Sequence, residues 1–188
     1  MLSLSDSDRS ALLRLARRSI EEVASSKRSP EDNIPRESIF SERCGVFVSL
    51  HVGGRLRGCI GVIEPNEPLG ETVVHCALGA AFEDVRFPPL RAEELPDMTV
   101  EVSLLTPMHV VRPEEVVVGQ HGLFVSRGPR KGLLLPQVAT EHHLTRDRFL
   151  EEACRKAGLP ADAWKDAATE IRAFTCEIAT EAGKLSPR

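Results

Sequence analysis

The residues with the greatest chemical potential lie in one short segment, LRGCIG, at positions 56–61. The segment is expected to form a strand, and because side chains alternate across a strand, Arg57, Cys59 and Gly61 are expected on one face. Two residues along a strand span about 7 Å, so the Arg57 guanidinium should lie near the thiol, where a cation favours the thiolate. Gly58 and Gly61 weaken a strand, but they let a ligand or another backbone approach closely. LRGCIG therefore predicts a functional site.

Cys59 is open to three kinds of chemistry: it can be a nucleophile, a redox-active thiol or a soft metal ligand. The alternative is a small buried hydrophobic residue, which describes most free cysteines. If the protein is an enzyme, His121 in GQHGL is the candidate base, because histidine titrates near neutrality. The alternative, which the pattern favours slightly, is a turn residue whose neighbours Gly119 and Gly122 supply positive φ angles. The residue types leave both pairs of alternatives open.

A second group of residues is predicted to line a binding cleft. Arg86 in DVRFPP is braced by prolines, and it can bind a carboxylate or phosphate bidentately or pin its loop by a structural ion pair. Gln137 shares a helical face with Glu141 at a spacing of four, which suits either a polar cleft or a solvated surface. The predicted cleft consists of Arg57, Gly58, Gly61, Arg86, Phe87, Gln120 and Gln137, and its expected ligand is a small anion.

The composition argues against several functional classes. The 188 residues carry a formal charge of −4 and only 4% aromatic residues, so nucleic-acid binding is not expected. Five widely spaced cysteines without a CxxC pair, and histidines without ligand spacing, predict reduced thiols and no metal. No nucleotide-binding or iron–sulfur motif occurs, so no cofactor is expected. An acidic start and the lack of a long apolar run predict a cytoplasmic protein that does not engage a membrane.

The elements that must position these residues suggest an α+β fold with antiparallel pairing. A two-residue turn at Gly53 and Gly54 predicts a hairpin in which Val48 faces Cys59. Residues 25–40 are expected to be a polar connector, and residues 169–179 a single closing strand. Helices are expected at about 8–25, 69–83, 136–143 and 146–157, strands at 44–52, 55–63 and 98–105, and a second hairpin within 119–136.

Six motifs occur in the order found in one known family: GVFVSLHVGGRLRGCIG, DVRFPPL, EVSLLTP, VGQHGL, GLLLPQVATE and FLEEACRKAGLPADAW. In this respect the chain resembles the AMMECR domain family, and in particular its bacterial members of the AmmeMemoRadiSam system protein A type. The resemblance implies a single AMMECR domain over 1–188, ordered from about 8 to 182. It also implies an antiparallel sheet flanked by helices, with a smaller α/β lobe and a cleft near LRGCIG.

Because relatives occur beside or fused to MEMO-like and radical-SAM proteins, the resemblance implies an accessory role with such partners. It brings no established reaction, so two functions are carried forward. The first is an accessory domain that binds a ligand or partner. The second is an enzyme that depends on Cys59, with Arg57 lowering the pKa of the thiol and His121 acting as base.

Overall fold

The computed structural model describes residues 4–25, 34–35 and 37–181, which divide into two compact units. Unit 1 takes the chain up to Leu105 and again from Glu177, and unit 2 is the stretch Thr106–Cys176 between them. Each unit contains a four-stranded antiparallel sheet with helices, which confirms the α+β expectation. The expected connector falls mainly outside the described residues, and its end forms a 3₁₀ helix, Ser38–Ser41.

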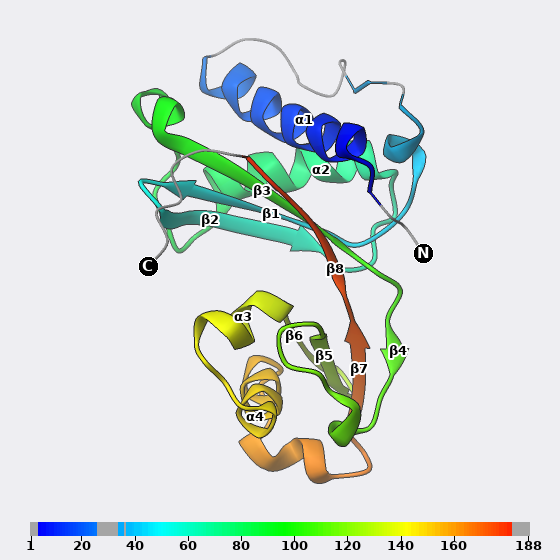
Figure 1. Ribbon diagram of the computed structural model, residues 1–188. Coiled ribbons are helices and arrows are strands. Elements are labelled where there is room, and N and C mark those ends of the chain that lie inside the picture. The colour runs from blue at the N-terminus through cyan, green and yellow to red at the C-terminus, as the bar shows by residue number, and fades with distance from the viewer. Residues whose placement is uncertain (1–3, 26–33, 36, 182–188) are drawn as a thin grey trace. The chain divides into compact units, whose positions relative to one another are not determined.

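Unit 1 is a sheet with two helices on one face (Figure 1). The strand order is β2-β1-β3-β8, so β2 and β8 are the edge strands. The strands are β1 (Val46–Val52), β2 (Arg55–Val62), β3 (Met98–Leu105) and β8 (Cys176–Thr180), and the helices are α1 (Asp6–Ala24) and α2 (Leu69–Leu78). A π-helix, Gly79–Glu83, continues α2, and a 3₁₀ helix, Ala92–Asp97, precedes β3.

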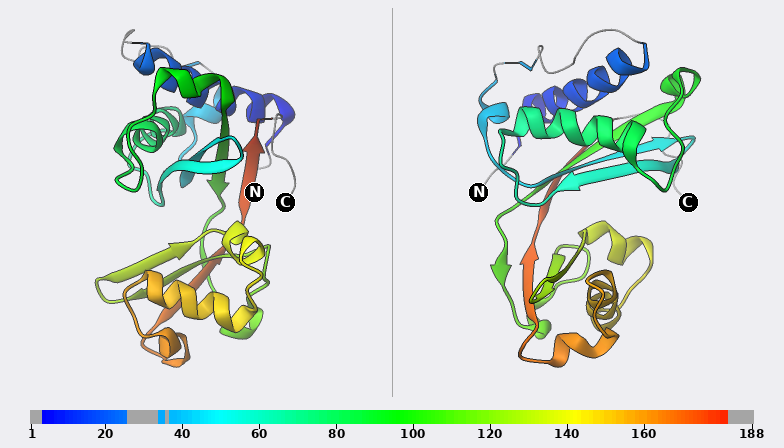
Figure 2. Two further views of the ribbon diagram at one scale, coloured as in Figure 1. Left: turned by 90° about the vertical axis from the view of Figure 1, so that its left-hand side faces the viewer. Right: turned by 180° about the vertical axis from the view of Figure 1, so that it is seen from behind.

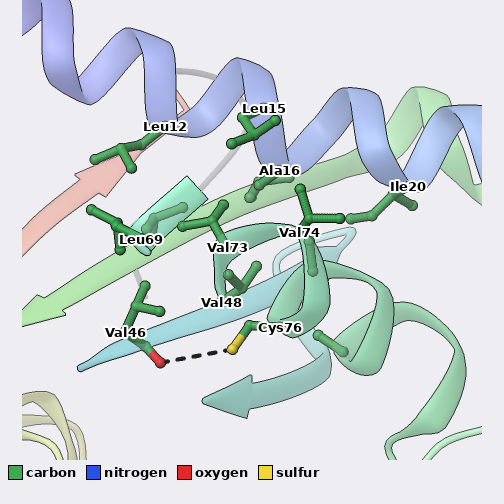
Figure 3. Close-up of a cluster of buried hydrophobic side chains, with 14 of the residues drawn as sticks. Leu12, Leu15, Ala16, Ile20, Val46, Val48, Leu69, Val73, Val74 and Cys76 are labelled. Atoms are coloured by element: carbon green, nitrogen blue, oxygen red, sulfur yellow. Dashed lines mark hydrogen bonds between the residues drawn. The ribbon is translucent and has the colours of Figure 1, made fainter. Parts of the chain in front are cut away.

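Helix α1 begins two residues before the expected position because its N-terminus is capped. The Ser5 hydroxyl accepts a hydrogen bond from the Asp8 amide, and the Asp8 carboxylate accepts one from the Ser5 amide. The buried side chains of α1 recur at helical spacing and face α2 and the sheet (Figure 3). They are Ala11, Leu12, Leu15, Ala16, Ser19 and Ile20.

The core of unit 1 lies between the two helices and the sheet (Figure 3). Val73 and Val74 of α2 and Val46 and Val48 of β1 are fully buried. Cys76 is buried with them, and its thiol lies 3.9 Å from the carbonyl oxygen of Val46. These contacts identify the face of β1 that points towards the helices.

The last strand of unit 1 is tied to the first helix. The Arg17 guanidinium donates to both carboxylate oxygens of Glu181, each at 2.6 Å, and also to the carbonyl oxygen of Met98. Glu181 in turn accepts a hydrogen bond from the amide of Val100 in β3. Bidentate pairing of this kind fixes geometry as well as charge. The Arg17–Glu181 pair therefore joins α1 to the residue that follows β8, 164 positions further along the chain.

Unit 2 is built from a second four-stranded sheet with helix α4 against it (Figure 2). The order is β4-β7-β5-β6, and Phe149 and Leu150 of α4 are fully buried with Leu123 and Val125 of β5. The elements are β4 (His109–Val110), β5 (Gly122–Arg127), β6 (Arg130–Leu134), α3 (Pro136–Glu141), α4 (Arg146–Lys156) and β7 (Glu170–Phe174), with 3₁₀ helices Pro113–Glu115 and Ala161–Lys165. Thr145 caps α4 as expected.

The expectation of one closing strand over residues 169–179 is wrong. The segment forms β7 in the sheet of unit 2 and β8 in the sheet of unit 1, with Thr175 between them. The Thr175 amide donates to the Thr106 hydroxyl, while the Thr175 carbonyl oxygen accepts a hydrogen bond from the Thr106 amide. Apolar alternation persists through the break, so the pattern alone does not reveal it.

The described helices include none that combines the length and the apolar character needed to cross a membrane.

Candidate functional site

Cys59 lies on the edge strand β2, opposite Ser49 and not opposite Val48 as expected. The pairing begins as predicted at Val52 and Arg55, and His51 still pairs with Leu56. Leu50 then pairs with Gly58, so the register shifts by one residue from there on. The extra residue, Arg57, is a β-bulge. A shift of one residue moves every later side chain to the other face, so the bulge explains the error.

The bulge places Cys59 on the face of the sheet opposite the helices. Val46, Val48 and Leu50 are fully buried on the helix face, and Ser49 alternates with them. Residues directly opposite each other on paired strands share a face, so Cys59 lies with Ser49. Val46, Val48 and Leu50 therefore do not line the Cys59 face as the predicted register required.

Polar groups run across this face of the sheet. The Ser49 hydroxyl donates to the Cys59 sulfur at 3.2 Å, and Ser49 is paired in register with Glu101 of β3. Beyond Glu101, the Thr180 hydroxyl of β8 lies 3.4 Å from the Glu101 carboxylate. We call Cys59, Ser49, Glu101 and Thr180 the polar row, which crosses all four strands.

The backbone of Cys59 is held by two side chains that follow α2. Its amide donates to Asp84 at 2.9 Å, and its carbonyl oxygen accepts from Arg86 at 3.2 Å. The same Asp84 carboxylate accepts from Arg86 Nε at 2.9 Å and from Nη2 at 2.6 Å. We call Cys59, Asp84 and Arg86 the Cys59 clasp. It satisfies backbone groups that an edge strand would otherwise leave open to pairing.

The two charged members of the clasp differ in exposure. The Asp84 side chain is 4% exposed, whereas that of Arg86 is 54% exposed. Hydrogen bonding from Arg86 lowers the pKa of Asp84 well below its ordinary value, against the opposing effect of burial. Asp84 is therefore a carboxylate at neutral pH, and it fixes a guanidinium whose other side faces solvent.

The thiol of Cys59 is not activated. Burial is the largest influence and raises its pKa, and the carboxylates of Asp84 and Glu101 act in the same direction. The Ser49 hydrogen bond and the charge of Arg86 oppose this rise without overcoming it. The thiol is therefore protonated at neutral pH.

Arg57 is not the cation beside the thiol. Its guanidinium donates to both carboxylate oxygens of Glu94, at 2.8 and 3.1 Å, and to the carbonyl oxygens of Pro88 and Pro89. The Arg57 side chain is 13% exposed. Arg57 therefore links β2 to the loop before β3. Arg86, and not Arg57, is the cation beside Cys59.

The two glycines of LRGCIG make room for the protein itself. A Cβ on Gly58 would lie 1.9 Å from the carbonyl oxygen of Ala80, and one on Gly61 would lie 2.2 Å from the Phe47 ring. Gly58 thus allows another backbone to come close, one of the two roles expected of it. Neither glycine leaves space for a ligand.

The other members of the predicted site divide between the units. Phe87 follows Arg86 in unit 1, and the Arg86 guanidinium carbon lies 5.4 Å from the centre of its ring. Gln120, His121 and Gln137 belong to unit 2, with Gln120 in the turn before β5 and Gln137 in the first turn of α3.

His121 is held in its turn by the backbone. Its Nδ1 accepts a hydrogen bond from the Val117 amide at 3.2 Å, and its ring centre lies 6.2 Å from that of His109. Burial is the larger of two influences that lower the pKa of His121, and His109 is the other. His121 is therefore neutral at pH 7, with the proton on Nε2.

Within residues 4–25, 34–35 and 37–181, no group of three histidine, cysteine, aspartate or glutamate side chains is arranged to hold a metal ion.

Comparison with known proteins decides the family. The family model of AMMECR1 matches residues 13–179. This chain belongs to the AMMECR1 family. The protein TK0174 of Thermococcus kodakarensis is 44% identical over 183 residues, covering 90% of this chain and 88% of that protein. A Methanothermobacter thermautotrophicus protein is 44% identical over 190 residues, covering 96% and 97%.

The crystal structure of the uncharacterized protein PH0010 from Pyrococcus horikoshii has the same fold as this AMMECR1-family chain. The TM-score is 0.85 at 41% identity, covering 94% of this chain and 92% of that one. The names of these relatives assign no reaction, so the argument for a function depends on the geometry of the site.

Sequence reasoning missed Asp84 and Ser49 as members of the site of this AMMECR1-family chain. Ser49 had a detectable signal, because it is the only polar residue in the apolar run VFVSL. Asp84 stands two residues before Arg86 in the motif DVRFPP, but its bond to the amide of Cys59 connects positions 25 apart. A contact at that separation leaves no local pattern.

Proposed function

We propose that this AMMECR1-family chain is an accessory domain that recognises a partner or an anionic ligand at the surface around the Cys59 clasp. The observation that carries the proposal is the Arg86 guanidinium, which is 54% exposed and yet fixed by a buried carboxylate. A guanidinium already held in one geometry loses little freedom when it binds. No partner of Arg86 Nη1 occurs among the described residues, so its hydrogens are available to an acceptor from outside.

The chemistry of the clasp favours recognition by geometry over long-range attraction. Asp84 neutralises most of the charge of Arg86, so the pair exerts little net field. What it offers is the pair of N–H donors of Nη1 at a fixed position, which suits a carboxylate or phosphate oxygen. Val85, between the two charged residues, is 99% exposed and adds an apolar contact beside these donors.

The accessory role is favoured over a cysteine enzyme by the state of the thiol. Nucleophilic catalysis needs a thiolate or an adjacent base, and burial keeps the Cys59 thiol protonated. The family resemblance suggests which partners to test first, namely MEMO-like and radical-SAM proteins encoded with relatives of this chain.

The deciding experiment measures binding of this chain to each of those two proteins, and to inorganic phosphate, by calorimetry. Arg86→Gln removes the guanidinium and its Nη1 donors, and we expect at least about fivefold weaker binding to whichever of these binds the native chain. Arg55→Gln, at an exposed arginine of β2, is the matched control and should bind like the native chain.

Because Arg86→Gln leaves Asp84 buried without its cation, a second variant avoids any effect on folding. Val85→Ser changes a side chain that contacts only solvent, and it should weaken partner binding without lowering the melting temperature. Val110→Ser, at a 66% exposed valine of unit 2, is its control. If neither protein nor phosphate binds, or if Arg86→Gln and Val85→Ser bind like their controls, the proposal is wrong.

A further inference from the structure

Unit 2 contains a groove that the proposed function does not use. It has a volume of about 690 Å³ and lies between the end of β6, helix α3 and the last turns of α4. Ligand sites in proteins commonly have volumes of about 300–1,000 Å³. Its lining consists of Leu134, Val138, His142, Leu144, Glu152, Arg155 and Lys156.

The lining is segregated by chemistry. Leu134, Val138 and Leu144 are partly buried hydrophobic residues that pack against the core of unit 2, and they form an apolar floor. The charged residues of the lining come from one helix, α4. A ligand that fills the groove therefore contacts apolar side chains on the floor and charged side chains of α4 along one wall.

The charges on that side leave one cation without a carboxylate partner. Arg155 pairs with Glu152, so these two residues of the lining neutralise each other. Lys156 has no side-chain partner among the described residues, and as the last residue of α4 it lies at the partial negative charge of the helix C-terminus. Its side chain is thus the cation of α4 at the groove that can pair with an anion.

The walls of the groove are held in place by direct backbone contact. A Cβ on Gly132 of β6 would lie 2.3 Å from the Ala157 nitrogen and 2.6 Å from the Lys156 carbonyl carbon. Strand β6 and the end of α4 therefore pack without a side chain between them. A groove with fixed walls is prepared for a ligand without reorganisation.

From this arrangement we propose that the groove binds a small amphipathic monocarboxylate, with its apolar part on the floor and its carboxylate at Lys156. The proposal does not depend on the function of the Cys59 clasp, which lies in unit 1. A ligand of this class buries apolar surface and supplies the missing anion at the same time.

The probe is octanoate, titrated into the full chain to about 10 mM at low salt, where exposed charges are weakly screened. Binding is followed by backbone amide NMR shifts, with 1-octanol as the neutral analogue. We expect saturable shifts at the groove and at least about fivefold tighter binding of octanoate than of 1-octanol. Shifts that do not saturate, or equal affinities for the two probes, would overturn the proposal.

Two variants test the two halves of the site. Lys156→Glu should weaken octanoate binding about fivefold or more, while Lys131→Glu, which makes the same charge change at an exposed β6 residue outside the lining, should not. Val138→Thr keeps the shape of the floor but adds a hydroxyl, and it should weaken both probes by about threefold. Equal binding by Lys156→Glu and Lys131→Glu would refute the assigned carboxylate position.

Discussion

Strands β2 and β6 are both edge strands, and the structure covers their open edges in two different ways. Each is the outer strand of a hairpin, each lies at the edge of its sheet, and each contains a glycine pressed against the backbone of a helix end. Gly58 of β2 meets Ala80, and Gly132 of β6 meets Ala157. The edge of β2 is further closed by charged side chains of a loop, whereas β6 borders the groove of unit 2.

The difference shows what the charged residues add. Close backbone packing is common to both edges and needs only a glycine. The Asp84 carboxylate and the Arg86 guanidinium are particular to β2, where they occupy the hydrogen-bonding groups of Cys59. In both edge strands the glycine therefore allows close packing against a helix. The charged groups near Gly58 distinguish β2 as the candidate functional site.

The largest expected effect tests the feature that the two edges share. Gly58→Ala and Gly132→Ala should each lower the free energy of unfolding by about 3 kcal/mol, because the added Cβ meets backbone atoms that cannot turn aside. Urea unfolding measures the loss. Gly79→Ala is the control. Gly79 has helical backbone angles, and its added Cβ would lie 3.2 Å from a methyl group of Ile60, a side chain that can move. We therefore expect the free energy of unfolding to change by less than about 1 kcal/mol. Losses as small as in the control would show that the close packing is not required.

The next effect separates the two edges by their response to acid. Asp84→Asn should cost about 2 kcal/mol at pH 7, less than a fully buried pair because half of Arg86 lies in solvent. The folded pKa of Asp84 is lowered, so its contribution is complete above the unfolded value of about 3.9 and is lost as the pH falls below it.

Urea unfolding between pH 7 and pH 3 checks this sign. The native chain should lose stability towards pH 3 more steeply than Asp84→Asn. The exposed Asp147→Asn in unit 2 should follow the native curve. A native chain and an Asp84→Asn variant with parallel curves would contradict the role given to this carboxylate.

The smallest effect concerns the cysteines of the two units. Burial raises the pKa of both Cys59 and Cys154, so iodoacetamide should modify each more slowly at pH 7 than a free thiol. Ser49→Ala removes a hydrogen bond that lowers the pKa of Cys59, and we expect labelling at Cys59 to slow by about twofold with Cys154 unchanged. Site-resolved mass spectrometry measures both rates. Rapid labelling of Cys59 at pH 7 would instead favour the cysteine enzyme.

The parts of the fold that the sequence predicted are those set by local rules. Gly53 and Gly54 have positive φ angles of 57° and 76°, as a two-residue hairpin turn requires, and Ser5 and Thr145 cap their helices. The bulge at Arg57 has no such local signal, because LRGCIG alternates equally well with or without it. A single inserted residue therefore reversed the predicted environment of Cys59.

The site was predicted less well than the fold, for a related reason. Arg57 was expected at the thiol because it is two residues away, yet its partner Glu94 is 37 positions distant. The position beside Cys59 went to Arg86, at a separation of 27. Ion pairs between distant segments depend on how loops return to the sheet, and spacing along one strand does not contain that information.

The path of the chain through β3 and β8 has a consequence for biosynthesis. Unit 2 is continuous, so all of its residues are synthesised before Glu181. Unit 1 needs that residue to close its bond with Arg17, and it lacks its edge strand β8 until unit 2 has been synthesised. The amino-terminal unit is therefore the one that finishes last, contrary to the usual order in which domains fold as they are synthesised.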